Sequence, residues 1–310
     1  MIYNVTEYLE RNARSMPNKI AVSDRSGAYT WRELRDRARR IATSLLSEGT
    51  ERGIMVYGDK SFDVLSVFLG AAYAGLFYSL MSTELPASRL RQSAEVLGVG
   101  TVVADGEHLD AAREIFEGKR IIASNELCGN DADDALLAKA AARHIDTDPL
   151  YINFTSGSTG TPKGIAVCHR SVVDFIECFT DIFGITSDDV IANQAPFDFD
   201  VSVKDIYSSL KTGAELSIVP RELFSQPAAL LDWLCDHGTT TMIWAVSALC
   251  LISTFHGLDY KVPEKVNKIL FSGEVLPYKH FKTWKTHLPE AVFVNLYGPT
   301  EITCNCTYHI

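Results

Sequence analysis

The sequence predicts an α/β protein in which mainly parallel strands are covered by helices. Short apolar runs of strand length alternate along the chain with longer segments whose apolar residues recur at helical spacing. The run GIMVY at 53–57 has the composition of a buried strand. A β-α-β alternation of this kind favours parallel pairing, because each crossover helix returns the chain to the same end of the sheet.

The first half of the chain begins its regular pattern with a capped helix. Thr30 and Glu33 are spaced as a capping box, in which the two side chains satisfy the first backbone N–H groups of the helix. Apolar residues at helical spacing follow this signal, and Gly49 ends the helix. The elements expected next are a strand at 53–57, a helix beginning at Ser61, a strand at 77–80, a helix starting near Pro86 and a strand at 101–104.

Residues 124–148 interrupt the alternation. This segment is polar, acidic and rich in alanine, which indicates a surface connection with one exposed helix. We therefore expect two α/β lobes, residues 1–145 and residues 146–310. The second lobe would contain strands at 151–154, 190–193, 215–219, 240–244, 268–271 and 292–296, and a helix capped by Ser171 and Asp174.

The composition excludes several classes of protein. The chain has 310 residues, 46% of them hydrophobic and 22% charged, which is ordinary for a globular protein. A net charge of −10 argues against electrostatic binding to nucleic acid. No apolar run approaches the roughly 18 residues of a membrane span, and residues 1–12 lack the apolar core of a signal peptide. We expect a cytoplasmic protein that does not bind membranes.

Seven cysteines are scattered along the chain. An odd, dispersed set indicates reduced thiols rather than a disulfide framework. Cys304 and Cys306 are spaced too closely for a usual zinc motif, so buried thiols are the expectation there.

The stretch TSGSTGTPKG at 155–164 has the composition of a phosphate-binding loop. Its glycines allow close approach of the backbone, its hydroxyl groups can donate hydrogen bonds, and Lys163 supplies a positive charge. The loop differs from the P-loop of ordinary NTPases at Pro162 and Gly164. From composition alone, a surface loop without a ligand is the alternative.

The same region, YINFTSGSTGTPKGIAVCHRSV, closely resembles the phosphate loop of adenylate-forming enzymes. The closest resemblance is to amino-acid adenylation domains of nonribosomal peptide synthetases and to D-alanine–carrier protein ligases. Four further segments resemble that family's motifs in the same order: AYTWRELRDRARRIA, FDVSVKDIYSSLKTGAEL, LFSGEVLP and NLYGPTEITCN. The resemblance implies the family's large N-terminal domain, two helix-covered sheets stacked as an αβαβα core.

The resemblance also implies a reaction and a set of nucleotide-binding residues. An amino-acid carboxylate attacks the α-phosphorus of ATP, and the aminoacyl group of the resulting aminoacyl-AMP passes to the phosphopantetheine thiol of a carrier protein. Thr300 would contact the α-phosphate, Glu301 would bind Mg²⁺, and Lys163 would assist in neutralising charge. Tyr297 would stack on adenine, with a core aromatic as its alternative role. The other nucleotide-binding residues implied are Thr155, Ser156, Gly157, Ser158, Thr159, Gly160, Gly273, Glu274, Asn295 and Gly298.

For the amino-acid substrate, the resemblance selects Asp200 as the carboxylate that pairs with the α-ammonium group. Asp198 lies two residues earlier, but the FDVSV match favours Asp200. The other substrate-contacting positions implied are Val201, Lys204, Trp244, Leu270, Ser272, Leu296, Cys304 and Asn305, which together suggest a small or polar substrate side chain. For Lys204 two interpretations stay open: a solvent-facing lysine of an amphipathic helix, or a group that binds an acidic or carbonyl-bearing substrate.

Two alternatives remain beside amino-acid activation: an acyl- or aryl-CoA ligase of the same superfamily, which Asp200 disfavours, and a non-catalytic module that binds nucleotide or amino acid. The family's small C-terminal domain, with its catalytic lysine, would lie beyond Ile310. We therefore expect residues 1–310 to represent an N-terminal core that is poorly active alone. Leu80 and Ser82 also depart from the family's usual Pro and Asp.

Overall fold

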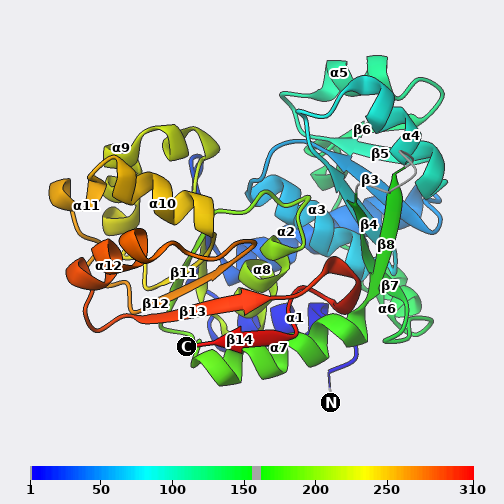
Figure 1. Cartoon of the computed structure of the whole chain (residues 1–310). Coiled ribbons are helices and arrows are strands. Elements are labelled where there is room, and N and C mark those ends of the chain that lie inside the picture. The colour runs from blue at the N-terminus through cyan, green and yellow to red at the C-terminus, as the bar shows by residue number, and fades with distance from the viewer. Residues whose placement is uncertain (1, 156–161) are drawn as a thin grey trace. The chain divides into compact units, whose positions relative to one another are not determined.

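The computed structural model describes residues 2–155 and 162–310, and the chain forms two compact units. The first unit comprises Met1–Lys19, Thr30–Phe175 and Pro196–Asp198. The second comprises Ile20–Tyr29, Ile176–Ala195 and Phe199–Ile310. Each unit contains one sheet with helices packed on it (Figure 1). The predicted fold class, two helix-covered and mainly parallel sheets, is confirmed.

The first unit is built on a six-stranded sheet with the order β6-β5-β3-β4-β7-β8. All of its pairings are parallel except the antiparallel β7–β8 hairpin. The strands are β3 (Gly53–Tyr57), β4 (Phe77–Met81), β5 (Thr101–Ala104), β6 (Arg120–Ala123), β7 (Pro149–Thr155) and β8 (Lys163–Cys168). Every residue of β3, β4 and β5 is buried, as expected for parallel strands covered on both faces.

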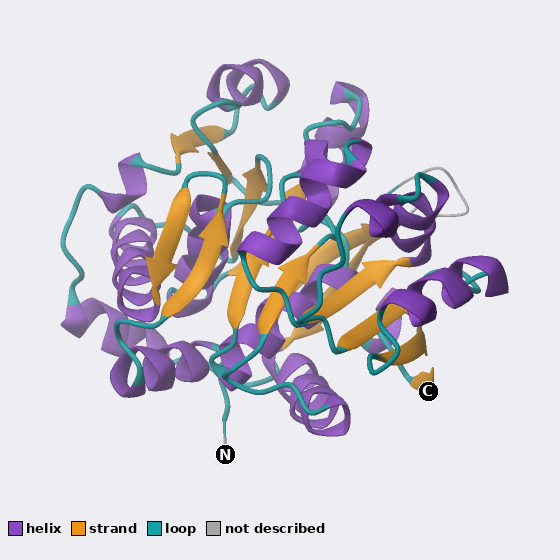
Figure 2. Ribbon diagram, turned by 90° about the vertical axis from the view of Figure 1, so that its left-hand side faces the viewer, coloured by secondary structure: helices purple, strands orange, loops and turns teal. Residues whose placement is uncertain are grey.

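Helices lie against the strands of the protein (Figure 2). Those of the first unit pack along its sheet and on one another. They are α1 (Thr6–Ser15), α2 (Trp31–Ser47), α3 (Phe62–Tyr73), α4 (Ala87–Leu97), α5 (Leu109–Ile115), the short η1 (Glu126–Cys128), α6 (Asp134–Ala141) and the first part of α7 (His169–Phe183). The capping box of α2 forms as predicted: Thr30 Oγ1 accepts the Glu33 N–H, and Glu33 Oε2 accepts the Thr30 N–H.

Helix α7 begins two residues earlier than the predicted cap at Ser171. The N–H groups of His169 and Arg170 donate to the carbonyl oxygens of Asp148 and Asp146, so the preceding segment satisfies the first turn. His169 is buried, and its Nδ1 accepts the backbone N–H of Val5 at 3.3 Å, which joins α7 to the start of α1. The ring of His144 packs against it edge-on, with centroids 4.5 Å apart.

The second unit contains an eight-stranded sheet with the order β14-β13-β12-β11-β9-β10-β1-β2. Its strands are β1 (Ile20–Asp24), β2 (Gly27–Thr30), β9 (Val190–Asn193), β10 (Glu215–Ile218), β11 (Thr241–Ala245), β12 (Lys268–Ser272), β13 (Val292–Tyr297) and β14 (Thr307–His309). The neighbours from β1 to β13 run parallel, and β14 is antiparallel to β13. The helical elements are the remainder of α7, α8 (Val201–Thr212), η2 (Arg221–Ser225), α9 (Pro227–Asp236), α10 (Val246–Thr254), α11 (Gly257–Tyr260), α12 (Tyr278–His287) and η3 (Thr300–Ile302).

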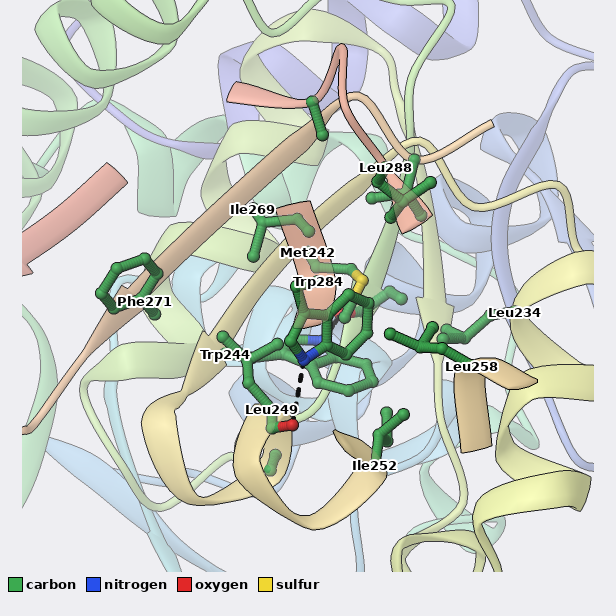
Figure 3. Packing of buried hydrophobic residues seen from close by; sticks show 14 of the residues in the cluster. Leu234, Met242, Trp244, Leu249, Ile252, Leu258, Ile269, Phe271, Trp284 and Leu288 are labelled. Atoms are coloured by element: carbon green, nitrogen blue, oxygen red, sulfur yellow. Dashed lines mark hydrogen bonds between the residues drawn. The ribbon is translucent and has the colours of Figure 1, made fainter. Parts of the chain in front are cut away.

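The apolar core of the second unit joins its sheet to helices α9–α12 (Figure 3). Trp244 and Trp284 are both fully buried in this cluster. The indole N–H of Trp284 donates to the Leu249 carbonyl, and that of Trp244 donates to the Ala192 carbonyl at 2.8 Å. Each indole thus buries a large apolar surface without leaving its N–H group unsatisfied.

A buried carboxylate ties together the amino-terminal ends of three strands in this sheet. Asp189 precedes β9, and its Oδ1 accepts hydrogen bonds from Thr240 Oγ1 (2.6 Å), Thr241 Oγ1 (3.0 Å) and Lys268 Nζ (2.8 Å). Its Oδ2 accepts the Thr186 N–H at 2.8 Å. Burial alone would raise the pKa of Asp189, but the hydrogen bonds from Lys268, Thr240 and Thr186 outweigh it and lower the pKa.

The two units differ from the lobes expected from the sequence at two places. The strand at 151–154 was expected after the boundary at residue 145, but it is part of β7, which pairs with β4 and with the unpredicted β8 and so belongs to the first sheet. Strands β1 and β2 lie early in the sequence, but β1 pairs with β10 and so belongs to the second sheet. Pairing between distant segments, which local sequence patterns do not encode, determines both assignments.

Candidate active site

The described ends of the candidate phosphate loop belong to strands β7 and β8 of the first unit. Thr155 ends β7 and Lys163 begins β8, and the two residues are paired across the hairpin. Thr155 is half-buried and Lys163 is exposed. Five residues predicted to bind phosphate lie outside the described residues: Ser156, Gly157, Ser158, Thr159 and Gly160.

The other candidate residues all belong to the second unit, and several lie at the carboxyl ends of its parallel strands. Leu270 and Ser272 are on β12, and Ser272 is in register with Leu296 on β13. Because side chains two residues apart share a face of a strand, Leu270, Ser272 and Leu296 are on one face of the sheet. All three are buried, Ser272 with 9% of its surface exposed. The carboxyl ends of parallel strands are the usual place for ligands in α/β sheets.

Trp244 is separated from these three residues. It is in register with Phe271, and Phe271 with Asn295, which puts Trp244 on the opposite face of the sheet. Its ring packs in the apolar core against Phe224, with centroids 5.3 Å apart. The structure therefore gives Trp244 a role in the core, whereas the sequence had placed it beside the substrate.

Asp200 stands at the start of α8. It is half-buried, and its side chain makes no capping hydrogen bond to the helix. Its backbone carbonyl accepts the thiol of Cys304 at 3.0 Å, which links the beginning of α8 to the segment that follows β13. The structure thus brings Asp200 next to Cys304, two of the predicted substrate-contacting residues, while Val201 begins the helix beside them.

Lys204 lies one turn further along α8 and is buried, with 1% of its surface exposed. Its Nζ donates to Oδ1 of Asn305 at 2.8 Å. Burial lowers the pKa of Lys204, and the negative charges of Asp205 and Asp200 offset part of this effect. Burial also raises the pKa of the Cys304 thiol, so this neighbour stays neutral. The interpretation of Lys204 as a solvent-facing lysine is wrong, because nearly the whole of α8 is buried.

The segment after β13 forms a tight turn that returns the chain as β14. Tyr297 is 69% exposed, so its alternative role as a core aromatic is excluded. A methyl group on Gly298 would lie 2.4 Å from the Cys304 carbonyl oxygen and 2.5 Å from Asn305 Cα. Glycine is therefore required at 298, because the backbone of 304–305 passes directly over it.

The remaining nucleotide-side residues flank the ends of β12 and β13. Gly273 follows β12 with a φ of +98°, a conformation that favours glycine, and Glu274 is exposed beside it. Asn295 is half-buried on β13. In η3, Thr300 is half-buried and Glu301 is exposed.

The chemistry of Glu301 fits a magnesium ion held partly by phosphate. Mg²⁺ usually takes one or two protein carboxylates together with substrate phosphate oxygens and water. Among the described residues, no group of three His, Cys, Asp or Glu side chains could hold a metal ion.

The cysteines are all free thiols. Cys304 is buried, as expected, but Cys306 is exposed. No helix in residues 2–155 and 162–310 has the length and apolarity needed to cross a membrane.

Sequence reasoning missed the left-handed backbone at Thr303 and Cys304, whose φ angles are +65° and +74°. It also missed the buried contact between Asp205 Oδ2 and Asn193 Nδ2, at 2.6 Å, on the inner side of α8. No local sequence pattern indicates either feature. The positive φ angles at Thr303 and Cys304 are visible only in the folded backbone, and the Asp205–Asn193 contact joins a helix to a strand.

The fold and these motifs identify the class of protein. The sequence pattern of the AMP-binding enzyme family matches residues 9–310, so the chain belongs to that family. A D-alanine–D-alanyl carrier protein ligase of Bacillus cytotoxicus is 31% identical over 312 residues, covering 97% of this chain and 60% of that protein. Syringomycin synthase SyrB1 of Pseudomonas syringae pv. syringae is 29% identical, covering 97% of this chain and 49% of that protein. The chain thus spans about 60% or less of the length of these relatives.

Solved structures show the same fold. The nonribosomal peptide synthetase FmoA3 superposes with a TM-score of 0.87 at 23% identity, covering 99% of this chain and 32% of that chain. VinN superposes with a TM-score of 0.85 at 22% identity, covering 98% of this chain and 77% of that chain. These structures confirm the fold, while the family match and the carrier protein ligase and synthase relatives confirm the expected resemblance.

Proposed function

We propose that the protein activates an amino acid with ATP in the cytoplasm and passes the aminoacyl group to the phosphopantetheine thiol of a carrier protein. The observation that carries this proposal is the family match over residues 9–310, together with 31% identity to a ligase that acts on a carrier protein. The carboxylate of Asp200, which makes no capping bond and stands beside Cys304, supports an amino acid over other acids.

The proposed reaction has two group-transfer steps. In the first, a carboxylate oxygen of the amino acid attacks the α-phosphorus of ATP, the bond to the bridging oxygen breaks, and pyrophosphate leaves. In the second, the thiol sulfur attacks the acyl carbon and AMP leaves. Both steps bring anions together or separate them, so binding geometry and charge neutralisation supply most of the catalysis.

We propose a role for each candidate residue. Asp200 pairs with the α-ammonium group, because a carboxylate that is half-buried gains most from a cationic partner. The exposed ring of Tyr297 offers a surface on which adenine can stack, with Gly273 and Asn295 beside the base. Thr300 donates to the α-phosphate and Lys163 to the departing phosphates. Mg²⁺, when bound by Glu301, neutralises charge on the phosphate oxygens.

Stable analogues of the intermediate test the proposal. In aminoacyl sulfamoyl adenosines a sulfamoyl group takes the place of the phosphate of aminoacyl-AMP. These compounds do not react, so their equilibrium affinity for this chain can be measured. We expect at least one of these probes to bind at least tenfold more tightly than AMP. It combines the contacts of the adenosine portion with those of the aminoacyl portion. Asp200→Asn should remove that gain, and the exposed Asp188→Asn should keep it. A preference for fatty-acyl or aryl probes, or affinity no better than that of AMP throughout, would refute amino-acid activation.

A further inference from the structure

Lys204 has an unusual environment for an ammonium group. It is 1% exposed on α8, and the amide oxygen of Asn305 is the hydrogen-bond acceptor that it reaches. Within the part of the chain that the structure describes, Lys204 bonds to this amide rather than to a carboxylate, and the charges of Asp205 and Asp200 act on it without a hydrogen bond. An ammonium group has three protons to donate, and burying it without a counter-ion is unfavourable.

The two carboxylates nearest in sequence do not fill this role. Asp205 is fully buried and its Oδ2 accepts the Asn193 amide. Asp200 stands four residues before Lys204, a spacing at which opposite charges on a helix usually meet. Lys204 nevertheless donates to Asn305. The two residues are about one helical turn apart along the backbone of α8.

A strained turn holds Asn305 at this position. Thr303 and Cys304 both have positive φ angles, +65° and +74°. The Asn305 N–H donates to the Thr303 carbonyl at 3.1 Å across a three-residue turn, a geometry that is rare because it is strained. The thiol of Cys304 and the close backbone approach at Gly298 fix the turn from both sides. Strain of this kind persists where the surroundings enforce it, and it clusters at ligand sites.

We propose that the substrate is an amino acid whose side chain ends in a carboxylate, and that Lys204 binds this carboxylate. Asp200 takes the α-ammonium group, and the Thr303–Cys304 turn holds the Asn305 amide at the Lys204 ammonium group. This inference rests on the proposed amino-acid activation and narrows its substrate from small or polar side chains to acidic ones. An alanine or serine side chain would bring no carboxylate to the buried ammonium group.

The test uses sulfamoyl adenosine probes of L-aspartate, L-glutamate, L-asparagine, L-glutamine, L-serine and L-alanine. One acidic probe should bind about ten- to a hundredfold more tightly than its amide counterpart, because a charge-assisted bond replaces a neutral one in a buried site. Lys204→Met should abolish that ratio. Lys282→Met, a change at an exposed lysine of α12, should leave it intact.

A second variant keeps the test decisive if Lys204→Met does not fold. Asn305→Asp is nearly isosteric and gives Lys204 an internal carboxylate at the 2.8 Å contact now made by the amide. It should preserve or raise thermal stability and still abolish the preference for the acidic probe. Neutral probes that bind as tightly as acidic ones, or a preference that survives either variant, would overturn the inference while leaving amino-acid activation standing. Failure of every aminoacyl probe to exceed AMP would overturn both.

Discussion

The carboxylate of Asp189 should be one of the largest single contributors to the stability of the second unit. It joins the strand ends of β9, β11 and β12 through one ion pair and three further hydrogen bonds. In Asp189→Ala, Thr241 remains fully buried without this acceptor, and the Lys268 side chain, 17% exposed, loses its counter-ion. The perturbation therefore leaves several groups unsatisfied at once.

The magnitude follows from these losses. Removing one partner of a buried ion pair typically costs about 3–5 kcal/mol, because the other charge stays buried. Lys268 retains some access to water, so we expect about 3–4 kcal/mol for Asp189→Ala, near the lower part of that range. Asp189→Asn keeps the shape and part of the hydrogen bonding but loses the charge, and about 2 kcal/mol is expected.

Hydrogen exchange measured residue by residue is the suitable assay, because it reports on β9, β11 and β12 separately from the first unit. Amide protection in these strands should fall by the stated free energies, while Asp188→Asn, at the exposed neighbour, should leave it unchanged. Because the folded-state pKa of Asp189 is lowered, its contribution is present above the unfolded pKa of about 3.9 and is lost as the pH falls through the lower folded value. A loss below 1 kcal/mol for Asp189→Ala would refute the reasoning.

Two further predictions concern the first unit and the turn after β13. Burial and the neighbouring His144 lower the pKa of His169 to about 3, so stability should decline as the pH falls from about 6.5 towards 3, with a slope of up to about 1.4 kcal/mol per pH unit. His169→Asn retains an acceptor for the Val5 N–H and should flatten that slope in urea unfolding, and an unchanged slope would contradict the assignment. Gly298→Ala should weaken aminoacyl-probe binding at least tenfold and lower stability by about 1–3 kcal/mol, because its methyl group meets backbone at 2.4 Å. The control is Gly106→Ala, where a methyl group meets nothing within 4 Å, and equal effects of the two changes would disprove the steric argument.

Local patterns predicted the elements of the fold well but not their partners. The structure confirms the strands at 53–57 and 101–104 and the capping box of Thr30 and Glu33. Apolar runs and helix caps depend on residues that are close in sequence, so they can be recognised locally. The start of α7 differed, since carbonyl groups from 146 and 148 satisfy its first turn. The strand at 151–154 was assigned to the second lobe because no local signal shows that β7 pairs with β4.

The candidate site was predicted in its residue types but not in its environments. The motif around Asp200 identified α8, but the polar residues of this helix are mostly buried, so its sequence pattern did not reveal that Lys204 is inside. Trp244 was placed beside the substrate by the resemblance alone, whereas the strand register directs its ring into the core. Strand register and backbone strain depend on the whole fold, so the sequence alone could not predict the environments of Trp244 and Lys204.

The position of β1 has a consequence for how the chain is synthesised. Ser23 on β1 donates to Glu215 on β10 at 2.6 Å, a contact between residues 192 positions apart. At about 5–20 residues per second, the ribosome needs roughly 10–40 s to deliver β10 after β1 has been made. During that interval β1 and β2 have no sheet to join, and their backbone groups stay open to other chains. Production of the second unit in cells should therefore depend on chaperones that bind extended segments, and a fragment that ends before residue 215 cannot bury this hairpin in its own sheet.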